Sequence, residues 1–144
     1  SVGSDKFIYK MNWLNKFSEW AKELTKKYDG VILTGDFNIA PEDKDCHDPN
    51  AWAGQILVST EERKLFNNIL NIGFHDSYRE INPDKQEYSW WDYRMAGFRR
   101  NLGMRIDHIL VSKKIMPNVK KSYIDKKPRT LDRPSDHTPV VTEL

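Results

Sequence analysis

Five polar side chains lie where an apolar strand would end or turn. Asp36 and Asn38 follow the apolar run 31–33 and Gly35, Asp107 lies within a second apolar segment, and Asp136 and His137 precede a third. Carboxylates bind Mg²⁺, an Asp or an Asp–His pair can orient or deprotonate water, and Asn and protonated His donate to phosphate oxygens. Hydrolysis of a phosphodiester needs these functions together. Each segment alone could equally be an ordinary turn, because Gly, Asp and Asn are common turn residues.

The strand expected over residues 31–36 is the element that has to position the first two of these side chains. Its apolar residues suit a buried strand, and Gly35 lets the backbone turn or lets another group approach closely. Asp36 and Asn38 would project on the same side if the extended geometry continues. A second strand is predicted over residues 105–112. Asp107 within it would be costly unless it is paired or solvated at a site.

Helical periodicity predicts two helices. The first spans about residues 9–28, with Lys26 and Lys27 at its C-terminus and Gly30 as its stop. Its apolar positions, whose tryptophans we interpret as core packing, are Trp13, Phe17, Trp20, Ala21, Leu24 and Tyr28. The second opens with a capping box formed by Ser59 and Glu62 and ends at Gly73. Its inner face is expected to consist of Phe66, Ile69 and Leu70.

The remaining segments favour strands and loops. Residues 87–93 are aromatic and typical of a strand, and further strands are predicted over 119–124 and after Pro139. Residues 40–58 form a long polar connection whose acidic run, containing Asp43, Asp45 and Asp48, could hold a metal but is better interpreted as a solvated loop. Taken together, the pattern indicates the α/β (α+β) class.

Composition bounds the kind of protein. The 144 residues, 38% of them hydrophobic, suit one domain with its own core. No apolar run approaches the roughly 20 residues of a membrane span, so no membrane partner is expected. The single cysteine, Cys46, excludes an internal disulfide framework and fits a reducing compartment such as the cytoplasm.

Charge is distributed unevenly along the chain. Residues 1–93 carry a net charge of −5, whereas residues 94–133 contain 12 Lys or Arg and only three Asp. A basic segment behind an acidic one is expected where carboxylates do chemistry and cations hold a polyanion. A solvated basic face is the plainer alternative.

Four motifs, in this order, resemble one family. These are Gly35-Asp36-Phe37-Asn38, Ser89-Trp90-Trp91-Asp92-Tyr93-Arg94, Arg105-Ile106-Asp107 and Ser135-Asp136-His137 with Pro139. The chain resembles the endonuclease/exonuclease/phosphatase superfamily, and the second motif narrows this to the exonuclease III type of apurinic/apyrimidinic endonuclease. The resemblance covers only the C-terminal half of such a protein, so residues 1–144 are expected to be a single-domain fragment. It implies half of a four-layered α/β sandwich, mostly antiparallel sheet with helices on one face.

The resemblance also implies roles for individual residues. Asp36 would orient or activate water, and Asn38 would help hold the phosphate or the water. Asp107 would pair with His137 or assist the leaving group, and His137 would contact the phosphate. Asp136, Asp36 and Asn38 would bind Mg²⁺ or Mn²⁺. Trp90, Met104 and Ile106 would form the apolar pocket for an abasic deoxyribose, and Arg94, Arg99 and Arg100 would contact DNA phosphates.

The implied function is that of a Mg²⁺-dependent DNA repair nuclease. Its partner would be double-stranded DNA, incised 5′ to an abasic site or degraded and dephosphorylated at a 3′ end. The missing N-terminal half, which carries the family's metal-binding glutamate, would be a second partner, and the fragment could self-associate through an uncovered sheet face. Two alternatives are a phosphatase for inositol phosphates or phospholipids and a non-catalytic DNA-binding or packing fragment.

Overall fold

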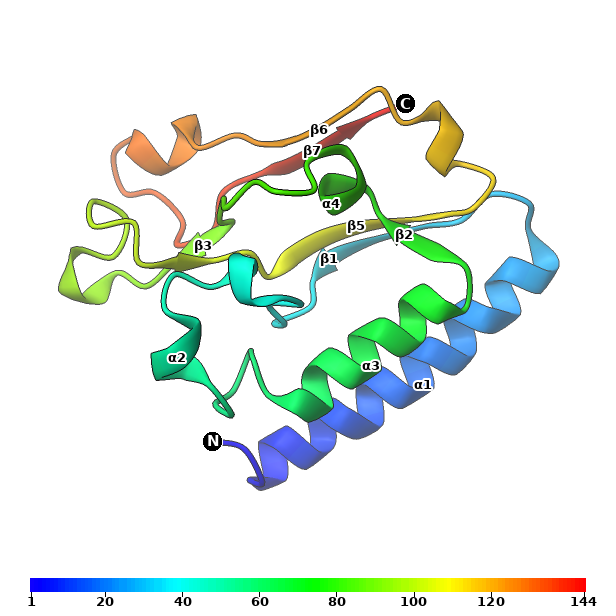
Figure 1. Ribbon diagram of the computed structural model, residues 1–144, viewed down its shortest axis with the longest axis horizontal. Helices are drawn as coiled ribbons and strands as arrows, with labels where there is room; N and C mark the ends of the chain where they lie inside the picture. Colours follow the sequence, from blue (N-terminus) through cyan, green and yellow to red (C-terminus); the bar gives the residue numbers. More distant parts are fainter.

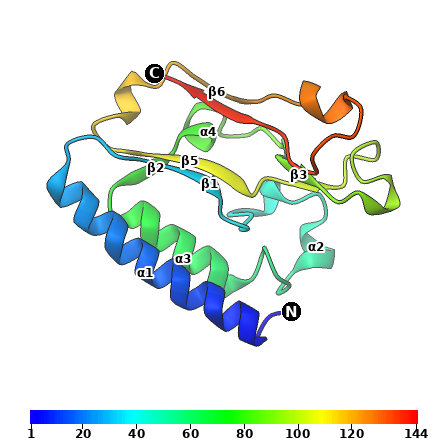
Figure 2. The same ribbon diagram turned by 180° about the vertical axis from the view of Figure 1, so that it is seen from behind.

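A pair of helices, a central antiparallel sheet and a second small sheet lie in three layers in the computed structural model, which describes residues 1–144 (Figures 1 and 2). The helices are α1 (Asp5–Lys27), α2 (Pro49–Trp52), α3 (Thr60–Asn71) and α4 (Ser77–Ile81). The strands are β1 (Ile32–Asp36), β2 (Phe74–Asp76), β3 (Trp90–Trp91), β4 (Gly103–Met104), β5 (Asp107–Ser112), β6 (Lys121–Ile124) and β7 (Val140–Glu143). Short 3₁₀ turns occur at Asp43–Asp45, Arg94–Ala96, Met116–Asn118 and Lys127–Thr130.

The central sheet has the strand order β1-β5-β2, and both pairings are antiparallel. Helices α1 and α3 lie side by side against one face of it, while α4, β6 and β7 lie on the other side (Figure 1). The predicted α/β class, with antiparallel strands and helices on one face, is therefore confirmed. None of the helices is long and apolar enough to cross a membrane.

The main core lies between the helices and the sheet. Leu33 of β1 is opposite Leu110 of β5, and both side chains point toward α1 and α3. Ile32 and Thr34 point to the other face and are exposed, so β1 is buried on one face only and not on both. The core cluster comprises Leu14, Ala21, Val31, Leu33, Phe37, Ile39, Phe66, Ile69, Phe74 and Leu110.

Helix α1 begins earlier than its periodicity predicted and faces the core differently. The Ser4 hydroxyl caps it by accepting a hydrogen bond from the Phe7 amide. Its buried residues, Phe7, Leu14 and Ala21, recur every seven positions. The prediction that its tryptophans pack in the core is wrong, because Trp13 and Trp20 are 49% and 53% exposed. Each precedes a buried residue by one position, which turns it about 100° around the helix.

Helix α3 confirms the predicted capping box. The Ser59 hydroxyl accepts from the Glu62 amide at 3.3 Å, and the Ser59 amide donates to the Glu62 carboxylate at 3.1 Å. Phe66 and Ile69 are buried as expected, whereas Leu70 is partly buried at the edge of the cluster. The buried Glu62 carboxylate also binds Lys10 of α1, which ties the two helices together.

The strand expected over 87–93 is reduced to the two residues of β3. Trp90 and Trp91 pair with β4, where the backbone comes very close to the indole rings. A Cβ atom on Gly103 would lie 2.5 Å from Trp91 Nε1 and 2.8 Å from the Trp90 carbonyl oxygen. Only glycine therefore fits at this crossing, which leads the chain from the basic loop into β5.

Candidate active site

The register of two strands brings Asp36 and Asp107 together. Asp36 is the last residue of β1 and Asp107 the first of β5, and the antiparallel pairing sets them opposite each other. Paired residues share a face of the sheet. Because Leu33 and Leu110 take the face covered by α1 and α3, both carboxylates lie on the opposite face, at the end of the strands.

Asn38 reaches the same place by a turn and not by a continued strand. Its φ is +51°, so the extended geometry ends at Asp36. The Asn38 amide donates to Asp36 Oδ1 at 2.8 Å, and its side-chain Nδ2 donates to Asp36 Oδ2 at 3.0 Å. The two side chains predicted to lie together therefore do so, and they are joined by direct hydrogen bonds in a tight Asp-centred turn.

His137 completes the cluster from the far end of the chain. Its ring Nδ1 donates to the Asp107 carboxylate, at 2.9 Å and 3.1 Å from the two oxygens. Its other ring nitrogen, Nε2, is directed toward Asp36 and lies 3.8 Å from Oδ2. One imidazole thus bridges two carboxylates, with one face of the group open to solvent at Asp36.

Ser89 positions this group, a role that its place at the start of the Ser89–Arg94 motif did not predict. Its hydroxyl oxygen accepts from the amides of Ile106 and Asp107, at 3.0 Å and 3.1 Å, and so fixes the start of β5. Its carbonyl accepts from the Thr138 amide at 2.8 Å, which holds the segment bearing His137 beside it. A small buried serine carries no local signal of this kind, because both of its partners are distant in sequence.

The pKa values of Asp107 and His137 are both raised, for different reasons. Burial raises the pKa of the Asp107 carboxyl, although the hydrogen bond from His137 opposes the rise. Burial alone would lower the pKa of His137, but the hydrogen bond to Asp107 and the charges of Asp107, Asp36 and Asp136 outweigh it and raise that pKa. The imidazole therefore keeps its proton to a higher pH than a free histidine does, which suits a group that contacts an anion.

The residues present fit a divalent metal ion. Ligand atoms of Asp36, Asp107 and His137 all lie within 4.8 Å of one another. Two carboxylates on an open rim match the preference of Mg²⁺ for a few carboxylate oxygens and several waters. Asp136 is not in this group, since its Oδ2 accepts from Trp90 Nε1 at 3.0 Å. Its role as a ligand stays a prediction.

The three apolar residues assigned to a sugar pocket differ in accessibility. Met104 and Ile106 are buried in a second core cluster with Ala40, Cys46 and Val58. Trp90 packs on that cluster and is partly exposed. With His47, Trp52 and Leu102 it lines a cleft of about 390 Å³. Trp90 is thus the member of the trio that a ligand can reach in this arrangement.

The three arginines predicted to contact DNA lie on the loop between β3 and β4. All three are exposed. Arg94 is anchored by hydrogen bonds to the Asp92 carboxylate, and Arg100 donates weakly to the Met95 carbonyl at 3.4 Å. Arg94 also lines the Trp90 cleft. The structure therefore places Arg94 beside the accessible aromatic wall, and all three arginines lie outside the carboxylate cluster.

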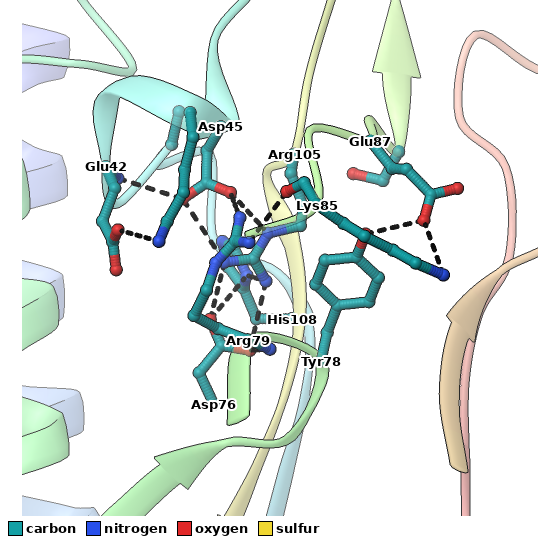
Figure 3. Close-up of polar contacts among 12 residues, drawn as sticks. Glu42, Asp45, Asp76, Tyr78, Arg79, Lys85, Glu87, Arg105 and His108 are labelled. Atoms are coloured by element: carbon teal, nitrogen blue, oxygen red, sulfur yellow. Dashed lines mark hydrogen bonds and ion pairs between the residues drawn. The ribbon is translucent and has the colours of Figure 1, made fainter. Parts of the chain in front are cut away.

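A buried ion network surrounds Arg105, which precedes β5, and joins it to Asp45, Asp76 and Tyr78 (Figure 3). The fully buried Arg105 donates to Asp45 at 2.7 Å and to Asp76 at 2.7 Å and 3.1 Å. Its guanidinium also stacks over Tyr78, 5.0 Å from the ring centroid, and Arg79 adds a second cation to Asp45. Asp45 is completely buried, so the interpretation of residues 40–58 as a solvated loop is wrong at this residue, whereas Asp43 and Asp48 of the same acidic run are exposed. The Arg105 partner of Asp45 lies 60 residues away, and the sequence gives no signal of that pairing.

His108 is the neutral member of this network. Its Nδ1 accepts from Arg105 at 3.1 Å, and its Nε2 donates to the Ile39 carbonyl at 2.8 Å. Burial, reinforced by the positive charge of Arg105, lowers the pKa of His108 to about 4. Arg105 likewise outweighs the effect of burial on Asp76 and holds the pKa of that carboxyl below its usual range.

We expect acid to destabilise the fold through His108 before the carboxylates titrate. Below its ordinary pKa of 6.5 the unfolded chain binds a proton there, whereas the folded chain does so only near pH 4. The free energy of unfolding should therefore fall by about 3 kcal/mol between pH 7 and pH 4. Urea unfolding at several pH values measures this. His108→Asn, which carries an acceptor and a donor but does not titrate, should remove most of the slope, and an unchanged slope would contradict the assignment.

Comparison with known proteins identifies the class to which this fold and site belong. The endonuclease/exonuclease/phosphatase family profile matches residues 2–137, and the chain belongs to this family. It is 33% identical to exodeoxyribonuclease III of Haemophilus influenzae over 96% of this chain and 55% of that protein. The exonuclease III-type resemblance seen in the sequence is thus confirmed.

Solved structures agree closely with the fold. A Neisseria 3′ phosphatase, NExo, bound to a product DNA hairpin, superposes with a TM-score of 0.97 at 44% identity, over 99% of this chain and 55% of that one. An AP endonuclease from Archaeoglobus fulgidus superposes with a TM-score of 0.91 at 33% identity, over 99% and 56%. The chain therefore spans about half the length of the relatives it matches.

Proposed function

We propose that this chain supplies the carboxylate–histidine half of the active site of a DNA repair nuclease. The reaction is hydrolysis of a phosphodiester, 5′ to an abasic site and at DNA 3′ ends, where exonuclease and 3′-phosphatase activities share the same centre. The observation that carries the proposal is the bridging of Asp36 and Asp107 by His137 on one open rim. The names of the relatives, an exodeoxyribonuclease III and an AP endonuclease, support DNA as the substrate.

Each side chain of the cluster has a task in the proposed reaction. Asp36, the most exposed of the three, orients a water molecule and takes up its proton as the water oxygen bonds to phosphorus. The phosphorus–oxygen bond to the 3′ oxygen then breaks, that oxygen takes a proton from solvent water, and Asp36 returns its own proton to solvent. His137, held by Asp107, donates from Nε2 to a phosphate oxygen, and Asn38 contributes a second polar group beside Asp36. Mg²⁺ or Mn²⁺ at the carboxylates would neutralise phosphate charge.

Substrate binding would use the loop beside this centre. An abasic deoxyribose, which has no base to accommodate, fits against Trp90 in the neighbouring cleft. Met104 and Ile106 belong to the buried cluster against which Trp90 packs. Arg94, Arg99 and Arg100 would contact phosphates on either side, which positions DNA without reading its sequence. We propose Asp136 as a further metal-binding group, with its carboxylate oriented by Trp90.

The other half of the site would come from further residues of the same protein. The sheet face opposite α1 and α3 exposes Ile32 and Thr34 of β1, and Tyr123 of β6 is exposed as well. A second half packed on that face would cover them and supply the family's metal-binding glutamate. We expect the isolated chain to bind DNA weakly and in a salt-sensitive way, with little turnover, and to self-associate at high concentration.

The decisive experiment uses the intact protein that contains this chain. A duplex with one abasic site should be nicked 5′ to the lesion when Mg²⁺ is present, and chelation with EDTA should abolish the cleavage. An undamaged duplex with blocked 3′ ends is the control for lesion specificity. Absence of incision in Mg²⁺ and in Mn²⁺, or incision that survives chelation, would contradict the proposed reaction.

A further inference from the structure

A second cleft lies between α1 and the turn formed by residues 36–38, which we call the catalytic turn. It has a volume of about 270 Å³. Its walls include Trp13 and Leu14 of α1, Asp36 and Asn38 of the catalytic turn, and Ile56 and Leu57 of the following loop. Any ligand in it lies directly beside the group that would hold the reacting phosphate. The volume is just below the roughly 300 Å³ at which pockets begin to hold drug-sized molecules, so it suits one small ring system.

Trp13 gives this cleft a flat aromatic wall. Half of its surface is exposed, although indole burial normally contributes strongly to a core. One face of its ring stacks on Phe17, with centroids 5.0 Å apart and an interplanar angle of 11°. This contact fixes the orientation of the ring, so it offers a rigid surface that needs little ordering when a ligand binds.

The charges around the cleft argue against a second phosphate site. Lys10, the nearest cation, donates to the Asn38 carbonyl and to the buried Glu62 carboxylate. Its charge is therefore neutralised within the protein. The other groups on this side are apolar, apart from Asp36 and Asn38 themselves. The cleft is therefore suited to a flat, largely apolar group that is attached to a phosphate.

We propose that Trp13 stacks on an unpaired nucleobase of the nucleotide next to the scissile phosphate. The inference rests on the proposed function, because it assumes that the phosphate lies at Asp36 and His137. Trp90 contacts the Asp136 side of the cluster, whereas Trp13 lies on the Asn38 side. The two indoles thus flank the catalytic group, and each can receive the nucleoside on one side of the phosphate.

Stacking of this kind determines which DNA ends bind well. Every base has an aromatic face, so the site tolerates any sequence, but only an unpaired base can enter it. Frayed or single-nucleotide overhanging 3′ ends should therefore bind more tightly than fully paired ends. The gain should disappear when the overhanging nucleotide has no base.

The test compares Trp13→Ala with Trp20→Ala in the intact protein. Trp20 is the matched control because it lies on the same helix, contacts the same Phe17 ring and is equally exposed, but lies away from the cleft. The Kd is measured by anisotropy in EDTA, so binding is separated from cleavage. The first probe is a duplex with one unpaired 3′ nucleotide. The second carries a tetrahydrofuran abasic residue in place of that nucleotide.

We expect Trp13→Ala to weaken binding of the first probe by about 5- to 150-fold, the range for loss of one base–aromatic stack. Binding of the abasic probe should stay within about twofold, Trp13→Phe should keep most of the affinity, and Trp20→Ala should change neither probe. Equal loss on both probes, no loss, or equal effects of the two alanine variants would overturn the inference. Failure of the wild type to cleave DNA in Mg²⁺ would instead contradict the proposed function.

Discussion

Asp36→Asn in the intact protein is expected to lower kcat for incision at an abasic site by about 10²- to 10⁴-fold. The variant keeps the size of the side chain and an oxygen that can accept from the Asn38 backbone amide. It loses the acceptor for Asn38 Nδ2 and the carboxylate that takes the proton of the attacking water. Because Asp36 is exposed at the strand end, the free energy of unfolding should change little. Steady-state kinetics on an abasic duplex measure kcat and KM separately, and KM should change less than kcat.

A control variant and a second catalytic variant test whether the loss of activity is specific to Asp36. Asp29→Asn changes an exposed carboxylate that pairs only with Lys114, and it should leave kcat unaltered. His137→Asn should also reduce kcat strongly, and the double variant with Asp36→Asn should be little worse than the more impaired single one, since groups that act as a unit are not additive. Full turnover by Asp36→Asn would remove Asp36 from the mechanism.

Arg105→Met is expected to be the most destabilising single change, lowering the free energy of unfolding by about 3–5 kcal/mol. Methionine fills much of the same space but leaves Asp45 and Asp76 buried without their shared cation. Urea unfolding monitored by circular dichroism measures the loss. Lys114→Met breaks an exposed ion pair with Asp29, so it should cost at most about 1 kcal/mol.

The cause of that loss can be separated from a general packing defect. If unpaired charge is responsible, combining Arg105→Met with Asp45→Leu and Asp76→Leu should recover a substantial part of the stability, because buried ion groups can often be replaced by apolar residues. A triple variant as unstable as Arg105→Met would show that unpaired charge is not the cause of the loss. An Arg105→Met variant as stable as the wild type would show that the network does not stabilise the fold.

The same network explains how a residue outside the site controls its geometry. Arg105 lies two positions before Asp107, and Asp45 lies in the segment that follows Asn38. Their ion pair, together with the Arg105 amide hydrogen bond to the Asp45 carbonyl at 2.9 Å, fixes the two chain segments that leave the active site. The positions of Asp36 and Asp107 therefore depend on contacts made outside the catalytic cluster.

Short-range sequence patterns were sufficient to predict most helices and strands of the fold. Helix spacing and caps predicted α1 and the capping box at Ser59, and apolar runs predicted β1, β5 and the terminal strand. Side-chain chemistry singled out Asp36, Asn38, Asp107 and His137, and the structure brings all four together. These features were predictable because each depends on residues within a few positions of one another, or on the limited set of side chains that can hydrolyse a phosphodiester.

Other features depend on contacts between distant segments, and only the tertiary structure determined them. Trp13 is exposed because the helix turns Leu14 and Ala21 toward the sheet. Helical periodicity alone does not determine which of two neighbouring positions faces the core. Asp45 is buried because Arg105 neutralises it from another strand, whereas its own neighbours are those of a solvated acidic loop. The sequence by itself thus determined which groups are available for catalysis. The register of β1 against β5, a choice made by side-chain packing across the sheet, determined that they meet.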